Sequence, residues 1–300
     1  MNNKQHYLAS RILLTLSYTE QFKFPLLAKE VYERLISKEI VSLENFNKAI
    51  KTLVNNKLIF KANDYLFIVG LSNNEMISLT NLRKKRSEIS KNKRNEVNQF
   101  LSIAKHIPFI TGIAVTGSLA VNNATKDDDI DFMVVTSKNR LWLTRIIMIV
   151  FASSIGKRRS FAKEEKNSWC FNLWVEESDL QLPVNSRSIY ESYEVVQSNW
   201  VLSRNNVASR FRSLNSWTNK FLVNSTYDFS NLEKHNIITR IPLFSEILDL
   251  LNYLVYLLQF IYMKKHMTRE KVSFTHAFFH PRDTKSLVFN NWRKTLLRLI

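Results

Sequence analysis

Two acidic residues, Asp129 and Asp131, lie one residue apart at the start of a hydrophobic run near the middle of the chain. Side chains on a β-strand alternate between its two faces, so these carboxylates share one face while Ile130 and Phe132 point to the other. Like charges at this spacing repel each other unless a cation lies between them, and Mg²⁺ prefers carboxylate oxygens. The pair therefore predicts a site for Mg²⁺ or Mn²⁺.

A glycine–serine pair, Gly117-Ser118, precedes the acidic pair by ten residues. It follows an apolar run, 109–116, that predicts a strand, and a short helix is expected to start near Leu119. Glycine permits a tight turn there, and the backbone N–H groups of such a turn, with a serine hydroxyl, bind phosphate oxygens. A phosphate site beside metal-binding carboxylates is typical of phosphoryl or nucleotidyl transfer, in which positioning and charge neutralisation supply most of the catalysis.

This arrangement resembles the nucleotidyltransferase superfamily of DNA polymerase beta. The motif of that family is a hydrophobic residue with Gly-Ser and, about a dozen residues later, Asp-hydrophobic-Asp-hydrophobic; the match covers roughly residues 110–135. The resemblance implies that Gly117 and Ser118 hold the triphosphate of a nucleotide and that Asp129 and Asp131 bind Mg²⁺. It also implies a third acidic residue on a later strand, which ligates the catalytic metal and helps to deprotonate the attacking hydroxyl.

The position expected for that third acid holds an amide. The later run that most convincingly predicts a strand is 169–175, WCFNLWV, and its centre is Asn172. An amide oxygen can ligate Mg²⁺, but it is uncharged and is no base at neutral pH. Glu176 or Glu177, just past this strand, could reach the site or be exposed strand ends, and we favour the second interpretation.

Over a longer stretch, the chain is similar to a group of mostly uncharacterised bacterial proteins that join a nucleotidyltransferase domain to an N-terminal winged-helix-like region. The shared residues are TGSLA, DIDF, WLTR at 142–145, CFN at 170–172, and Glu194 with Gln197. This resemblance implies that Asn172 belongs to the family pattern.

Composition limits the class of protein. The chain has 300 residues, 45% of them hydrophobic and 12% aromatic, which is typical of a folded protein with room for two small domains. Cys170 is the one cysteine, so disulfides within the chain are excluded and a reducing compartment is expected. The first residues show no cleavable-signal pattern, and we therefore expect a cytoplasmic protein.

The chain is strongly basic, with a net charge of +17. Such a charge favours polyanions, meaning RNA, DNA, nucleotides or an anionic membrane face. Within residues 82–94 lie seven basic residues, Arg83, Lys84, Lys85, Arg86, Lys91, Lys93 and Arg94. This segment predicts either a nucleic-acid contact or a solvated linker helix.

The first seventy or so residues predict a winged-helix-like unit. Its expected elements are helices over 7–16, 26–37 and 43–55, followed by strands over 57–60 and 65–69. Ser42 is the expected N-cap of the third helix, and Ala62-Asn63-Asp64 the hairpin turn. That helix has no Arg, so base reading in the major groove is weakly indicated and protein docking is the alternative.

After the central region, the pattern predicts core helices over 191–202 and 206–222. The segment 246–263 is almost wholly apolar except for a narrow stripe, Asp249, Asn252, Tyr256 and Gln259. Because these polar groups are costly in hydrocarbon, the stripe predicts a core helix rather than a membrane span, with peripheral membrane contact as the lesser alternative.

The expected architecture is α+β: a winged-helix-like domain over 1–75, a basic helical connector over 76–107, a mixed-sheet nucleotidyltransferase core over 108–185 and a helical C-terminal domain over 186–300. The expected reaction is metal-dependent transfer of a nucleotidyl group from a nucleoside triphosphate such as ATP to a hydroxyl of RNA, protein or a small molecule. The alternative is a nucleic-acid-binding winged-helix regulator whose impaired core senses nucleotide without turning it over.

Overall fold

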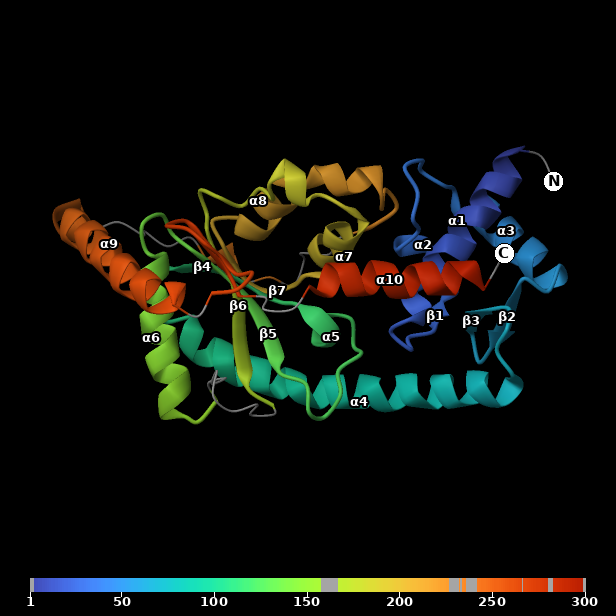
Figure 1. Cartoon of the computed structure of the whole chain (residues 1–300), viewed down its shortest axis with the longest axis horizontal. Helices are drawn as coiled ribbons and strands as arrows, with labels where there is room; N and C mark the ends of the chain where they lie inside the picture. The colour runs from blue at the N-terminus through green and yellow to red at the C-terminus, as the bar shows by residue number, and fades with distance from the viewer. Residues whose placement is uncertain are drawn as a thin grey trace.

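The structure, a computed structural model, describes residues 3–157, 167–226, 232, 234–235, 242–265, 267–279 and 283–298. The predicted α+β class is confirmed, with a mixed sheet and a largely helical C-terminal region. Figure 1 shows an elongated molecule with the N-terminal unit at one end and the large sheet in the middle. One long helix, α4 (Asn73–Ala104), runs beneath both.

The N-terminal unit combines helices with a small antiparallel sheet of order β1-β3-β2. Its elements are α1 (Asn3–Glu20), β1 (Leu26–Leu27), α2 (Ala28–Glu33), α3 (Leu43–Asn55), β2 (Ile59–Ala62) and β3 (Tyr65–Ile68). The Ser42 side chain accepts from Asn45 N and caps α3, as predicted. Asn63 and Asp64 both have positive φ, the conformation of a two-residue hairpin turn. The assignment of this unit as a winged helix, and its DNA binding, stay predictions.

One predicted element of this unit is wrong. Leu26 and Leu27 were expected to begin a helix, but they form β1, which pairs with β3. Leu26 is fully buried there, in a cluster with Ile12, Phe46 and Leu53. Pairing with β3 therefore overrides the helical pattern of this short apolar run.

Helix α4 begins with a capping box, in which Ser72 accepts from Glu75 N and the Glu75 side chain accepts from Ser72 N. Arg83 then fastens it to the N-terminal unit. Its guanidinium donates to Pro25 O at 2.8 Å and to the Glu30 carboxylate at 2.6 Å, and it lies 3.5 Å from the centroid of the Phe24 ring. The helix is thus a packed spine of the molecule and not a solvated linker.

The basic residues of α4 divide into two groups. Arg83, Arg86, Lys93 and Arg94 donate to partners within the protein. Lys84, Lys85 and Lys91 are exposed. Arg83 and Lys93 are buried, so these two turn their charge inward. A nucleic-acid contact through the segment stays a prediction.

The described residues form a seven-stranded mixed sheet of order β8-β7-β4-β5-β6-β10-β9, in which β5 is parallel to β6 and β7 to β8. Its strands are β4 (Ile110–Val115), β5 (Ile130–Thr136), β6 (Trp169–Glu176), β7 (Asn199–Arg204), β8 (Lys234–His235), β9 (Lys271–Val272) and β10 (His276–Phe278). The sheet therefore contains strands from before and from after residue 185, where a domain boundary was expected.

The stretch 199–204 corrects another prediction. Its residues 199–202 were expected to continue a helix, but the stretch forms β7, which pairs antiparallel with β4. The helix before it, α7 (Ile189–Gln197), ends at residue 197. A register shift against β4 lies between Trp200 and Leu202, so Trp200 packs in the cluster with α7 and α8 and Leu202 in the cluster with α4 and α6. Tertiary pairing decides the structure of this short run.

Helices cover both faces of the sheet. On one face lie α4 and α6 (Leu141–Ser154), and on the other lie α7 and α8 (Val207–Leu214). The remaining elements are α5 (Gly117–Ala120), α9 (Pro242–Lys264), which packs on α6, α10 (Thr284–Leu297), which packs on α1, and the short 3₁₀ turns η1 (Val184–Ser186) and η2 (Ser216–Lys220). Ile130, Phe132 and Val134 of β5 pack with α4 and α6, whereas Met133 and Val135 pack with α7 and α8. Successive residues of β5 thus pack against helices on opposite faces of the sheet.

Helix α9 contradicts the expectation of a core helix. Half of its described side chains are exposed and only Asn252 and Met263 are buried, and its polar stripe is the side that faces the protein. Asn252, which is fully buried, accepts from Trp142 N and Leu143 N in the first turn of α6, at 2.9 and 3.1 Å. Among the described residues, Ser245–Lys264 is the one helix long and apolar enough to cross a membrane, which by itself is weak evidence.

Glu176 lies far from the acidic pair. It is the register partner of Thr136, at the opposite end of β5 from Asp131. Its carboxylate is 1% exposed and accepts from Asn139 N at 2.9 Å and from Ser178 Oγ at 3.2 Å. Glu177 is half-buried and lies 3.5 Å from Arg210. Glu176 therefore neither reaches the acidic pair nor lies exposed at the strand end. The loop after β5, which contains Asn139, covers it.

The burial of Glu176 predicts how stability changes with pH. Desolvation raises its pKa from 4.5 to about 7, although hydrogen bonds from Ser178 and Asn139 oppose the rise. Since the folded pKa is the higher one, this contribution to stability is fully present below 4.5 and is lost as pH rises through 7. We expect Glu176 to lower the free energy of unfolding by roughly 3 kcal/mol across that window.

Glu176→Gln keeps an acceptor for Asn139 but does not ionise. The free energy of unfolding of this variant should therefore change by roughly 3 kcal/mol less over the same pH window. Urea unfolding at several pH values measures the difference. Glu177→Gln is the matched control, and equal flattening in both variants would contradict the assignment.

Candidate functional site

The two carboxylates of the motif lie at the start of β5, on the face opposite its buried aromatic side. Ile130 and Phe132 are fully buried on the other face, whereas Asp129 and Asp131 are half-buried. Asp129 Oδ1 accepts from Ser168 N at 2.9 Å, and Asp131 Oδ1 accepts from Asn172 Nδ2 at 2.6 Å. Both side chains are therefore held by neighbouring backbone or amide groups of the β6 segment.

Gly117 brings the glycine–serine turn against Asp131. Its φ is +64°, a conformation that favours glycine, and a Cβ at this position would lie 2.7 Å from Asp131 Oδ2. The adjacent backbone is fixed too, since Thr116 N donates to Asp131 O at 2.9 Å. The turn and the carboxylate can thus meet only because residue 117 has no side chain.

The turn leads into α5, which is four residues long. A helix this short adds little dipole to the turn, so the backbone N–H groups themselves are what it offers to an anion. The Ser118 hydroxyl already has an acceptor, because it donates to Asp128 Oδ2 at 2.7 Å.

Asp128, which directly precedes the acidic pair, organises this loop. Besides Ser118, it accepts from Thr125 N at 3.0 Å and from the Thr125 hydroxyl. Burial alone would raise its pKa, but the hydrogen bonds from Thr125 and Ser118 and the charge of Lys93 outweigh burial and lower it. Lys93 also donates to the Asp128 backbone oxygen at 2.7 Å. Asp128 is thus a structural acid, and Asp129 and Asp131 remain the candidate ligands.

Asn172 lies on β6 next to Asp131, at the place where the family resemblance implies an acid. Its amide nitrogen donates to Asp131, and its amide oxygen accepts from the Cys170 thiol. Asn172 therefore orients a candidate metal ligand without adding negative charge.

A further acid, Glu194, reaches this side of the sheet from α7. Its neighbour Val195 packs in the same apolar cluster as Met133 and Val135, which project from the same face of β5 as Asp131. Among the described residues, Glu194 has no hydrogen bond or ion pair. Although Glu194 is exposed to solvent, desolvation by the surrounding protein and the negative charges of Asp131 and Glu191 raise its pKa. The longer family resemblance had pointed to Glu194, but no local pattern in the sequence predicts that it approaches Asp131.

The donor set suits a hard divalent cation. Among the described residues, no group of three or more His, Cys, Asp or Glu side chains could hold a metal by itself. Mg²⁺, however, usually takes one or two carboxylates and completes its shell with waters and substrate phosphates. Asp129 and Asp131 offer such carboxylates, and the Gly117 turn lies against Asp131, so the residues present fit Mg²⁺ or Mn²⁺.

Residues 96–196 match the family model described as nucleotidyltransferase domain. The matched segment runs from the end of α4 to α7, so it contains the Gly117 turn, the carboxylates of β5, Asn172 and Glu194. It is consistent with the DNA polymerase beta-like superfamily that the motif resembles. No curated protein and no solved structure matches the chain.

The contact between Gly117 and Asp131 predicts the effect of adding one methyl group. Gly117→Ala should push the Asp131 carboxylate out of place and weaken binding of Mg²⁺ with a nucleoside triphosphate by at least about tenfold, since an uncompensated shift of one ligand costs about 1.4 kcal/mol or more. Calorimetric titration measures the affinity.

Gly156→Ala is the matched control, because Gly156 also has positive φ, +65°, and a Cβ added there would have no atom within 4 Å. Both variants should lose roughly 1–2 kcal/mol of stability from backbone strain. Equal nucleotide affinity in the two variants would show that the close contact does not govern binding.

Proposed function

We propose that this nucleotidyltransferase domain moves a nucleotidyl group from a nucleoside triphosphate to a hydroxyl acceptor, with Mg²⁺ or Mn²⁺ held by Asp129 and Asp131. The observation that carries the proposal is the approach of Asp131 to the Gly117 turn, where a Cβ would lie 2.7 Å from the carboxylate. Phosphate oxygens bound at that turn would lie beside the carboxylate that holds the metal. Binding of the triphosphate and of the cation would then support each other.

The triphosphate would be held mainly by backbone N–H groups around Gly117 and Ser118. Because the Ser118 hydroxyl donates to Asp128, it would have to leave this acceptor before it could donate to a phosphate. Asp128 in return keeps the loop in a single shape, which is what positioning of a flexible triphosphate requires.

When bound, the metal would neutralise phosphate charge and lower the pKa of the attacking hydroxyl. The chain's own groups would position it. Ser168 N holds Asp129 and the Asn172 amide holds Asp131, so both ligands keep fixed orientations.

Glu194 supplies the acidic group that Asn172 lacks. It projects from α7, which covers the face of β5 that carries Asp131, and its charge acts on the Asp131 site. A carboxylate in this place can accept the proton of the attacking hydroxyl, a task that an amide cannot perform. This arrangement favours an enzyme over a regulator that only senses nucleotide.

The class of acceptor is inferred from the exposed charge of α4. The exposed Lys84, Lys85 and Lys91 offer a small basic surface on α4 for an RNA acceptor. A protein or small-molecule hydroxyl remains the alternative, and the same assay reads all three. Use of a nucleoside triphosphate supports a cytoplasmic location.

The first test is label transfer. Each labelled nucleoside triphosphate is incubated with the protein, Mg²⁺ or Mn²⁺, and either total RNA, lysate protein or small metabolites. We expect transfer that falls by at least about a hundredfold in Asp131→Asn, because one ligand loses its charge. Asp127→Asn, the same substitution at an exposed acid of the same loop, should keep it. Tight nucleotide binding without transfer under either metal would instead support the regulator.

The second test concerns Glu194. Glu194→Gln should lower the transfer rate by about tenfold to a hundredfold, the range of a lost general base or third ligand, while the affinity for the nucleoside triphosphate changes little. Glu191→Gln, three residues earlier on α7, loses an ion pair with Lys285 and should keep the rate. If Glu194→Gln transfers as fast as the unmodified protein, Glu194 has no part in the reaction.

A further inference from the structure

Helix α9 presents an apolar face to solvent and its polar side to the protein. The outer face of α9, as we name it, consists of Ile247, Leu250, Leu251, Tyr253, Leu254, Leu258, Ile261 and Tyr262, which are 43% to 70% exposed. In a helix that packs on a soluble core, the apolar stripe faces inward. In α9, Asn252 and Gln259 face the protein beside Val255, Tyr256 and Met263, and much of the apolar surface faces solvent instead.

Specific hydrogen bonds fix this orientation. Asn252 accepts from two backbone N–H groups in the first turn of α6, and Gln259 Nε2 donates to Trp142 O at 3.1 Å. Asp249 pairs with Arg140 and accepts from Asn139 Nδ2 at 3.1 Å. Turning the helix to bury its leucines would leave these polar groups without partners, so the inward polar stripe is what the sequence specifies.

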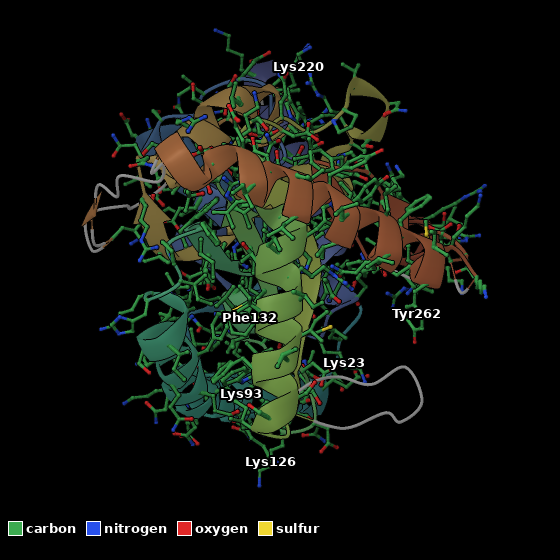
Figure 2. All side chains as sticks on the ribbon, turned by 90° about the vertical axis from the view of Figure 1, so that its left-hand side faces the viewer. Lys23, Lys93, Lys126, Phe132, Lys220 and Tyr262 are labelled. Atoms are coloured by element: carbon green, nitrogen blue, oxygen red, sulfur yellow. The ribbon has the colours of Figure 1, made fainter. Side chains whose placement is uncertain are left out.

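Helix α6 extends the apolar surface. Ile146, Ile147 and Val150 are 41% to 63% exposed, and α9 packs directly on α6. Figure 2 faces this end of the molecule and shows α9 lying across α6 in front of the remaining elements, with Tyr262 near one end of the helix. The two helices together form one apolar end surface, and exposed apolar patches of this kind mark interaction sites.

We propose that this end of the molecule docks on an anionic lipid bilayer, with α9 lying in the plane of the membrane surface. Between Ile247 and Met263 the one charged residue is Asp249, which turns inward, and Lys264 and Lys265 follow directly and are exposed. Aliphatic side chains with tyrosines and terminal lysines suit the boundary between acyl chains and anionic headgroups.

Charge decides between the membrane and a second copy of the chain. The net charge of +17 attracts an anionic bilayer, whereas two copies meeting at this face would repel each other. A bilayer-spanning position is also disfavoured, because Asp249, Asn252 and Gln259 would have to give up their partners and enter hydrocarbon. The helix therefore lies on the membrane rather than across it.

Vesicle flotation tests this docking. The full chain is mixed with phosphatidylcholine vesicles, with or without about 30% phosphatidylglycerol, an anionic content that gives a negative surface potential. We expect binding to the anionic vesicles and little to the neutral ones. The paired variant Leu254→Glu with Leu258→Glu should bind at least about tenfold more weakly, because the outer face can no longer enter the interface.

Ile40→Glu with Val184→Glu is the matched control. Both residues are exposed, at 82% and 76%, and lie outside the outer face of α9, while the change in net charge is the same. This control pair should keep vesicle binding. A second pair, Leu250→Asn with Ile261→Asn, alters the outer face without adding charge and should also weaken binding. Circular dichroism confirms that each variant is folded.

Three results would overturn the proposal. The first is absence of binding to anionic vesicles, and the second is equal weakening in the control pair, since bulk charge alone would then explain binding. The third is a dimer in solution that Leu254→Glu with Leu258→Glu dissociates while vesicles do not bind, because a second copy would then be the occupant. None of these readouts depends on nucleotidyl transfer.

Discussion

The approach of Asp131 to the Gly117 turn is the constraint on which the rest of the site depends. It arises because β4 and β5 pair antiparallel up to Val115 and Phe132, after which Thr116 N donates to Asp131 O. The chain must then turn away from a carboxylate beside its own backbone, and at φ +64° only glycine leaves room. The backbone N–H groups of the turn and the carboxylate are thus brought together by strand pairing.

The loop between the turn and the acidic pair is held by the basic spine beneath it. Lys93 donates to Asp128 O, Arg94 to Asn122 Oδ1 and Arg86 to Asn123 Oδ1. Positive side chains that could have formed a surface for polyanions are instead used to fix a loop containing three aspartates. This explains why a count of lysines and arginines in a segment overstates its electrostatic surface, since pairing inside the fold removes part of it.

Local periodicity was enough to locate β4, β5 and β6, because each is an apolar run with clear boundaries. It failed where a partner decides the outcome. Residues 199–204 become β7 because β4 offers an edge, and no spacing along the chain shows that Glu194 approaches Asp131. The stripe on α9 was recognised, but its direction was not, because a polar stripe that faces solvent and one that caps α6 through Asn252 look the same in sequence.

Helix α7 joins the site to the N-terminal unit. Tyr193 stacks on Tyr18 of α1, with ring centroids 4.4 Å apart, and its hydroxyl donates to Arg34 O at 2.9 Å. Glu194 is the next residue, and the same short helix leads into β7 and the sheet. Tyr193, which contacts the N-terminal unit, and Glu194, which lies on the Asp131 side of the sheet, are adjacent on one turn of α7. A shift of the N-terminal unit against the sheet would therefore move Glu194 relative to Asp131. The position of the N-terminal unit is therefore part of what shapes the site, whatever that unit itself binds.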